Sequence, residues 1–170
     1  MFDKIVLGFL MERKMTGYAI KKTMEKSTNF FFNTSYGNIY PTLKKLEEAG
    51  HLTSEEEIKN GKLNKSYSIT QSGKQVFRRW LGENSDIAMI RDEALCRVFF
   101  FEYLDKNKTI EELNSYISRL EAQVNEMTKL RKKLQSYEIN SWKMKTLDFG
   151  IDYYKYIQKS FQKMLKEIIE

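Results

Sequence analysis

The sequence is poor in three residue types that often build sites or staple folds. Cysteine, histidine and proline each occur once in 170 residues, as Cys96, His51 and Pro41. A single cysteine cannot form an intramolecular disulfide, which fits a reducing, cytoplasmic location. One cysteine and one histidine also cannot complete a Cys/His zinc site, so we expect no metal centre.

Long apolar runs and catalytic signatures are missing as well. The apolar stretch I-V-L-G-F-L-M at residues 5–11 is far shorter than the ~20 residues of a membrane-spanning helix, and no small-residue cleavage site accompanies it. The sequence has no Walker loop, G-x-G-x-x-G motif or nucleophile elbow. Cys96 falls in an apolar segment, where an inert core thiol is expected. We therefore predict no membrane association, no enzymatic activity and no cofactor.

The positive charge of the chain is confined to its first half. Residues 1–82 carry 14 Lys and Arg against 8 Asp and Glu, whereas residues 83–170 carry 15 of each class. The whole formal net charge of +6 therefore belongs to the first half. Because a basic surface favours a polyanionic partner, we expect such a partner to bind there.

The stretch S-Y-G-N-I-Y-P-T-L-K-K-L-E-E-A-G at residues 35–50 predicts a helix with two unlike faces. Ile39, Leu43 and Leu46 recur at helical spacing and form a stripe for burial. Pro41 requires the regular helix either to begin near residue 38 or to kink. Gly50 is the expected stop. The outward face carries Asn38, Tyr40, Lys44 and Lys45. These groups suit a DNA major groove, although the segment alone also fits an ordinary surface helix.

The elements around this stretch have the order of a winged helix. Helices are predicted over residues 2–12, 16–27 and 35–50, with Thr16 capping the second. Strands over 52–58 and 64–69 flank Asn60-Gly61, a strong hairpin signal with lysines on both sides. Thr70 is expected to cap a fourth helix over 71–81. Three helices followed by a basic-tipped hairpin predict a winged helix-turn-helix, in which the third helix reads bases.

Residues 83–170 predict an α-helical dimerisation domain, so the fold class is mainly α with a small β-hairpin. A buried apolar helix is expected over 87–104. Thr109 and Glu112 form a capping box that would start a long helix ending near residue 137. Its apolar residues recur in heptad steps from Ile110 to Met127, and a last helix over 142–169 would face them. Pairing of these two helices within one chain would explain the heptad spacing. The helices of residues 83–170 have more apolar surface than the first half could cover, however, and this excess favours a homodimer.

Several segments resemble the PadR family of bacterial transcriptional regulators. In the first half they are I-V-L-G-F-L-M (5–11), M-T-G-Y-A-I-K-K (15–22), S-Y-G-N-I-Y-P-T-L-K-K-L-E-E-A-G-H-L (35–52) and Y-S-I-T-Q-S-G (67–73). In the second half, R-D-E-A-L-C-R-V-F-F (91–100) and L-D-F-G-I-D-Y-Y (147–154) resemble members with a long helical tail. The resemblance implies a homodimer that binds an inverted-repeat operator in double-stranded DNA. In many members it implies repression relieved by a small, often aromatic, molecule.

The residue patterns and the resemblance together define two sets of candidate site residues. The candidate DNA contacts are Thr16, Gly17, Tyr18, Ser35, Tyr36, Asn38, Tyr40, Lys44, Lys45, Lys62 and Lys65. A cleft at the dimer interface could hold an aromatic effector against Phe99, Trp142, Tyr153 and Tyr154, although core packing explains the same four residues. Because the third helix and the wing lack arginine, a winged-helix module that binds protein and not DNA is the alternative function.

Overall fold

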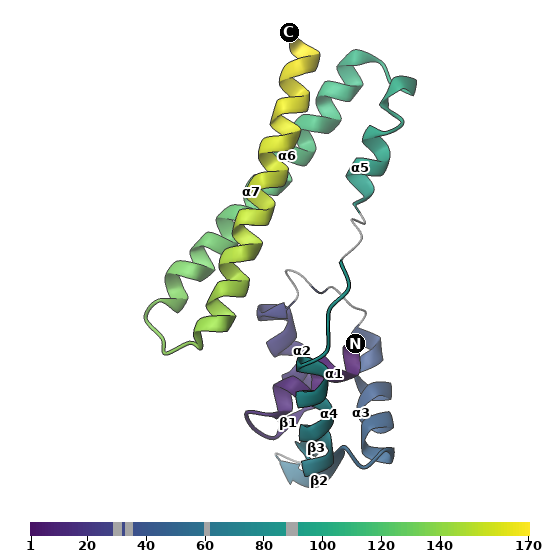
Figure 1. The fold of residues 1–170 in the computed structure, drawn as a ribbon, viewed down its shortest axis with the longest axis vertical. Helices are drawn as coiled ribbons and strands as arrows, with labels where there is room; N and C mark the ends of the chain where they lie inside the picture. The colour runs from purple at the N-terminus through teal and green to yellow at the C-terminus, as the bar shows by residue number, and fades with distance from the viewer. Residues whose placement is uncertain (29–31, 33–35, 60–61, 88–91) are drawn as a thin grey trace. The chain divides into compact units, whose positions relative to one another are not determined.

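The structure is a computed structural model that describes residues 1–28, 32, 36–59, 62–87 and 92–170. The chain divides into two compact units, Met1–Ile87 and Ala88–Glu170, and Figure 1 shows the helices and strands of each. The first unit contains α1 (Phe2–Leu10), β1 (Met15–Thr16), α2 (Gly17–Lys26), the 3-10 helix η2 (Tyr36–Asn38), α3 (Ile39–Glu48), β2 (Leu52–Lys59), β3 (Lys62–Ile69) and α4 (Gln71–Leu81). The second contains α5 (Glu93–Val98), the 3-10 helix η3 (Phe101–Tyr103), α6 (Lys106–Leu134) and α7 (Ser141–Ile169).

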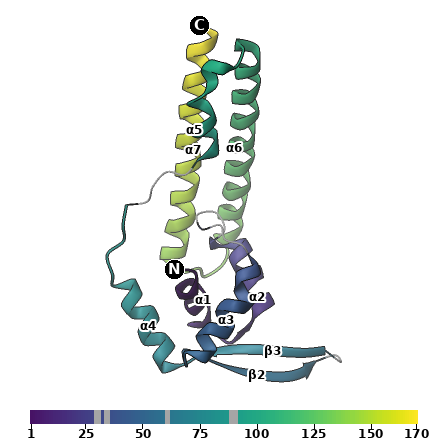
Figure 2. The same ribbon diagram turned by 90° about the vertical axis from the view of Figure 1, so that its right-hand side faces the viewer.

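The first unit has the predicted winged-helix order, with one element that the sequence analysis missed. Its antiparallel sheet has the strand order β1-β3-β2. The short strand β1, which the sequence analysis did not predict, pairs Met15 with Tyr67 and Thr16 with Ser66. We call β2 and β3 the wing; the two strands lie side by side in Figure 2. Its last paired residues are Lys59 and Lys62; the predicted turn residues Asn60 and Gly61 lie outside the described residues.

One apolar core holds the helices of this unit against the sheet. The stripe predicted for α3 is buried, with Ile39, Leu43 and Leu46 each no more than 4% exposed. Side chains from α1, α2 and the sheet complete the core. Burial of one stripe fixes which face of α3 points outward. The other buried members are Val6, Leu7, Leu10, Met15, Ile20, Met24, Leu52 and Tyr67.

Both ends of α3 follow from local chemistry. Pro41 is the third residue of the helix, so it falls in the first turn, where backbone N–H groups have no partner within the helix. Ser35, where the predicted helix would begin, lies outside the described residues. At the other end Gly50 has φ +71°, and the N–H of His51 donates to the carbonyl of Leu46 at 2.9 Å. Glycine adopts this left-handed conformation without steric cost, so the helix stops there as predicted.

In the second unit α6 and α7 pair within one chain. The heptad residues Leu113, Ile117, Leu120, Val124 and Met127 are all buried, and Leu147, Ile151 and Phe161 of α7 are buried as well. The helices approach closely at Gly150, where an added Cβ would lie 2.6 Å from Met127 Cε. Arg131, which interrupts the heptad, donates from Nε to Asp148 Oδ1 of α7 at 2.6 Å.

The helix predicted over residues 87–104 is wrong in length and in burial. Its regular part, α5, spans only Glu93–Val98, because the Asp92 side chain caps it by accepting from the N–H of Ala94 at 2.8 Å. Residues 88–91 lie outside the described residues. Only one face of this short helix packs on α6 and α7. Phe99 is 78% exposed, and Cys96 is exposed and is not a core thiol.

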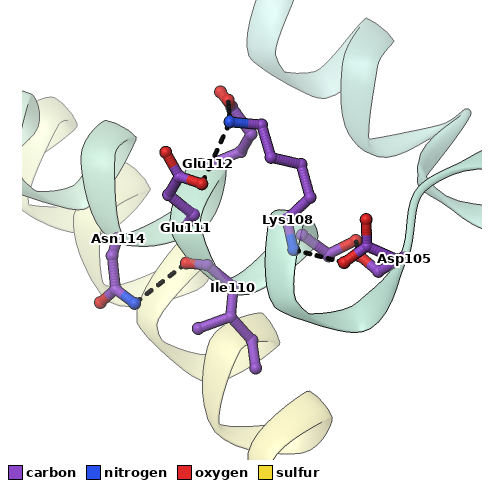
Figure 3. Close-up of polar contacts among 7 residues, drawn as sticks. Asp105, Lys108, Ile110, Glu111, Glu112 and Asn114 are labelled. Atoms are coloured by element: carbon purple, nitrogen blue, oxygen red, sulfur yellow. Dashed lines mark hydrogen bonds and ion pairs between the residues drawn. The ribbon is translucent and has the colours of Figure 1, made fainter.

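The capping box predicted at Thr109 is also wrong, because α6 begins one turn earlier. Asp105 is the N-cap, and its Oδ1 accepts from the N–H of Lys108 at 2.9 Å. The buried hydroxyl of Thr109 instead donates to the carbonyl of Asp105. Figure 3 shows this first turn, where the Lys108 ammonium lies 3.1 Å from Glu111 and 3.3 Å from Glu112. An aspartate four residues upstream is the cap that the sequence analysis overlooked.

Candidate nucleic-acid interface

The outward face of α3 presents the predicted mixture of aromatic and basic groups. Tyr40 is 63% exposed, and the Lys44 side chain is 78% exposed, 3.8 Å from Glu48 one turn on. Asn38 and Lys45 are exposed too. A weak surface pair of this kind leaves the lysine available to a stronger anion. The face therefore offers two ammonium groups, an amide and a phenol to a partner.

The start of α2 supports this face through a close contact. Thr16 caps α2 as predicted, its Oγ1 accepting from the N–H of Ala19 at 3.1 Å. Gly17 follows, and a Cβ added there would lie 2.8 Å from Cε1 of Tyr40. The glycine is buried and lets the Tyr40 ring lie against the first turn of α2. Tyr18 is exposed beside it, with the Lys22 ammonium 5.7 Å from its ring centroid.

An ion pair joins the wing to the end of α3. The Lys65 ammonium donates to Glu47 Oε2 at 3.1 Å, and the Ser54 hydroxyl donates to the other carboxylate oxygen of Glu47. Both hydrogen bonds lower the pKa of Glu47, and the bond from Ser54 has the larger effect. The hydrogen bond to Glu47 raises the pKa of Lys65. Lys65 is therefore held against α3, an arrangement that the sequence analysis missed.

The lysines of the wing lie near its tip, and the rest of the first strand carries acidic residues that offset them. Between residues 52 and 69 the wing carries three lysines and also three consecutive glutamates at 55–57, so its net charge is zero. Glu55 is paired with Lys14 at 3.1 Å. Ile58 and Leu63, which pair across the strands, are both largely exposed. The glutamate run on β2 therefore offsets the positive charge of the predicted basic tip.

Three of the predicted DNA contacts are only partly described or not described. Ser35 lies outside the described residues. The backbone of Tyr36 begins η2 and that of Lys62 begins β3, while the side chains of both lie outside the described part. The structure brings Gly17 and Tyr40 together and places Lys44 and Lys45 on the same helix.

Replacing Glu47 with glutamine should raise affinity for duplex DNA and steepen its salt dependence. The change removes a negative charge from the candidate interface and releases the ammonium of Lys65, which can then neutralise a phosphate. Each added phosphate contact raises the slope of log K against log salt by about 0.9. Fluorescence anisotropy of labelled duplex across a salt series measures this slope. The control is Glu83→Gln, the same charge change at an exposed site beyond α4; an E47Q slope equal to that of wild type would contradict the prediction.

The four predicted effector residues do not form one site within a single chain. Trp142, 69% exposed, lies in the first turn of α7. Tyr153 is eleven residues further on, about 16 Å along the helix axis. Tyr153 and Tyr154 contact each other edge to face, with ring centroids 5.6 Å apart. The ring of Phe99 contacts Phe100.

Stability of the helical unit should fall as pH rises from 10 to 12. The Tyr116 hydroxyl donates to Asp92 Oδ2 at 3.1 Å. Burial, aided by the charge of Asp92, raises the pKa of Tyr116 from 10.0 to about 12. In this window the folded state keeps a proton that the unfolded chain has lost, so unfolding becomes easier with rising pH. Urea denaturation across the window should show a smaller loss in Tyr116→Phe than in wild type, while the exposed Tyr137→Phe should match wild type.

The order of the helices and the three-stranded sheet define the first unit as a winged-helix domain. The model of the Transcriptional regulator PadR-like family matches residues 6–79. The model described as Virulence activator alpha C-term matches residues 90–165. The chain belongs to the PadR-like family of transcriptional regulators. That family consists of regulators and not of enzymes.

Individual relatives agree with this assignment. The negative transcriptional regulator PadR of Bacillus subtilis is 27% identical over 133 residues, which are 77% of this chain and 73% of the relative. A PadR-like transcriptional regulator from Bacillus cereus is 30% identical, with TM-score 0.85 over 98% of this chain and 96% of that one. Bacillus subtilis PadR in complex with operator DNA is similar in fold, at TM-score 0.90 and 23% identity over 98% of both chains. The same regulator with p-coumaric acid gives TM-score 0.83 at 22% identity, over 99% of this chain and 98% of that one.

The described part of the chain contains neither a membrane-spanning helix nor a cluster of metal ligands. Its helices do not combine the length and apolarity that crossing a bilayer demands. Its His, Cys, Asp and Glu side chains form no group of three that could hold a metal ion.

Proposed function

We propose that the chain is a homodimeric regulator that binds an inverted-repeat operator, with α3 in the major groove and the wing beside the backbone. The observation that carries this is α3 itself, which buries one apolar stripe and exposes Tyr40, Lys44 and Lys45 on the other side. A helix with that division fits a major groove. The operator complex of Bacillus subtilis PadR supports the assignment by its similar fold. A protein acting on chromosomal operators works in the cytoplasm.

The homodimer is supported by an apolar seam on α7 that the other described helices of the unit leave exposed. Trp142, Phe149, Tyr153 and Tyr156 are all exposed and follow one another at intervals of seven, four and three residues. Such spacing places them on one face of a helix, opposite the buried Leu147 side. A second copy of the chain would bury this seam, and twofold symmetry would direct two α3 helices toward two half-sites.

We further propose that the protein represses transcription and that a small aromatic effector releases it from the operator. Support comes from the curated relative, a negative transcriptional regulator, and from its complex with p-coumaric acid. In this chain Tyr153 and Tyr154 offer adjacent aromatic surfaces, and Phe99 and Trp142 would have to be contributed through the dimer. Quenching of tryptophan fluorescence by phenolic acids, and its loss in Trp142→Phe, would test a role for that residue.

The decisive experiment uses the DNA upstream of the chain's own gene. We expect the protein to retard a duplex carrying an inverted repeat from that region, and a scrambled repeat should bind more weakly. The logarithm of the binding constant should fall linearly with the logarithm of the salt concentration, because phosphate contacts release counterions. Sedimentation at micromolar concentration should show a dimer. No duplex binding at low salt, together with a protein partner retained at high salt, would instead support the protein-interaction module.

A further inference from the structure

The wing carries two exposed apolar side chains near its tip. Ile58 of β2 and Leu63 of β3 are paired across the strands, and they are 79% and 68% exposed. Residues that face each other in an antiparallel pair have neighbouring side chains on one face of the hairpin. The two therefore form a small apolar surface, which we call the tip pair, outside the apolar core of the unit.

The tip pair lies on the face of the wing that is turned toward α3. Side chains alternate between the two faces of a strand, so Ser54 lies on the same face of β2 as Ile58. On β3 this face carries Lys65 and Leu63. Ser54 and Lys65 both donate hydrogen bonds to Glu47 of α3. The tip pair continues the same face two residues beyond Lys65, about 7 Å along the strands.

This face of the wing meets α3 on the outward side of the helix. Glu47 follows Lys44 by three residues and Tyr40 by seven, a spacing that places all three on one side. The wing thus joins α3 on the side that carries the candidate DNA contacts. A duplex bound along that side would lie next to the tip pair as well.

The charges around the tip pair favour a nucleic acid as its partner. Residues 58–64 contain Lys59 and Lys62 and no acidic residue, since the glutamates of β2 end at Glu57. The two lysines are the next pair of the ladder after the tip pair. Proteins that bind the minor groove of DNA combine basic residues with apolar side chains in this way. Together with the position beside α3, this combination favours a duplex over a protein surface.

We propose that the tip pair enters the minor groove beside each operator half-site and selects A·T base pairs there. In the minor groove A·T pairs present only acceptors, whereas G·C pairs add the amino group of guanine. That amino group would obstruct an apolar side chain and would lose its water without gaining an acceptor, which is unfavourable. A·T pairs leave the same space free. The tip pair can act in this way only if the chain binds an operator, as proposed above.

Inosine separates the amino group from the other features of a G·C pair. An inosine·cytosine pair lacks that group, so it resembles A·T in the minor groove and G·C in the major groove. The operator duplex retarded by the full-length protein is prepared with A·T, G·C or inosine·cytosine pairs flanking both half-sites, and fluorescence anisotropy gives the affinities. We expect the G·C flank to bind about tenfold more weakly than the A·T flank, because it buries an unpaired donor. The inosine flank should bind like A·T.

The matching change in the protein replaces both apolar side chains with threonine. Ile58→Thr with Leu63→Thr keeps residues that favour strands and supplies hydroxyl groups that can accept from the guanine amino group. The three duplexes should bind this variant with nearly equal affinity, and its salt dependence should equal that of wild type because no charge changes. The control is Leu81→Thr, the loss of an exposed apolar side chain at the end of α4, which should keep the wild-type preference. Circular dichroism should show both variants folded, because the replaced side chains are exposed.

Failure of the tip pair and failure of operator binding give different results. If wild type binds none of the duplexes, both proposals are wrong. If it binds the A·T and G·C flanks equally, operator binding stands and the selection by the tip pair is wrong. An inosine flank as weak as the G·C flank would contradict the role of the amino group. A preference that persists in the double threonine variant would assign the selection to the shape of the DNA and not to Ile58 and Leu63.

Discussion

Replacing Lys44 and Lys45 together with alanine should lower operator affinity about a thousandfold at 0.1 M salt. In a homodimer the double substitution removes four ammonium groups from the two α3 helices. Each phosphate contact contributes about 0.9 to the slope of log K against log salt, so the slope should fall by between about three and four. The same arithmetic predicts that the operator affinities of wild type and of the double variant become equal near 1 M salt. Anisotropy titrations over a salt series measure both quantities.

The matched control for this double variant is Lys132→Ala with Lys133→Ala. These two exposed lysines lie in the last turn of α6, in the other unit, and their replacement removes the same number of charges. The control should keep most of the operator affinity and of the salt slope. If the α3 variant kept the wild-type slope, or if the control lost as much, the assignment of α3 as the phosphate-contacting helix would be wrong. Circular dichroism should show both variants folded, because all four side chains are exposed.

Features set by neighbours a few residues apart could be predicted from the sequence. The buried stripe of α3, the Thr16 and Thr70 caps and the left-handed Gly50 depend on spacing within one or two turns. The heptad from Leu113 to Met127 is predictable for the same reason. These patterns determine which side chains face inward, while the charge distribution, the order of the elements and the family resemblance together suggested DNA as the partner of the outward face of α3. The predicted membership of the chain in the PadR-like family is confirmed.

Features that join residues far apart in sequence could not be predicted in this way. The pair of Glu47 with Lys65 spans eighteen positions, and no local pattern says that α3 and the wing meet there. The exposure of Phe99 likewise depends on which side of α5 packs on α6 and α7. Apolar composition alone led to the expectation of a long buried helix. Composition gives the amount of apolar surface but not the partner that covers it.

Gly73 shows the same limit, and replacing it with alanine should destabilise the DNA-binding unit by about 2–3 kcal/mol. Its sequence context predicts a gain, since alanine is favoured over glycine by about 1 kcal/mol inside a helix. In the structure, however, an added Cβ would lie 2.3 Å from the carbonyl oxygen of His51 and 2.8 Å from Ile69. That oxygen accepts from the N–H of Thr70 at 3.0 Å, so it cannot retreat without breaking the junction between the wing and α4. Overpacking of this kind costs about 1–3 kcal/mol and occasionally more.

Gly82→Ala, at the other end of α4, is the matched control. A Cβ there would meet only the carbonyl oxygens of Arg79 and Arg78, at 3.5 and 3.9 Å, which are ordinary contacts. Its φ of −90° is open to any residue, so stability should be unchanged or slightly higher. Urea denaturation followed by circular dichroism compares both variants with wild type. Because the junction positions the wing beside α3, G73A should also weaken operator binding under conditions where it is still folded. A G73A protein as stable as G82A would mean that the carbonyl of His51 can move aside, and that the wing is not fixed to α4 at this point.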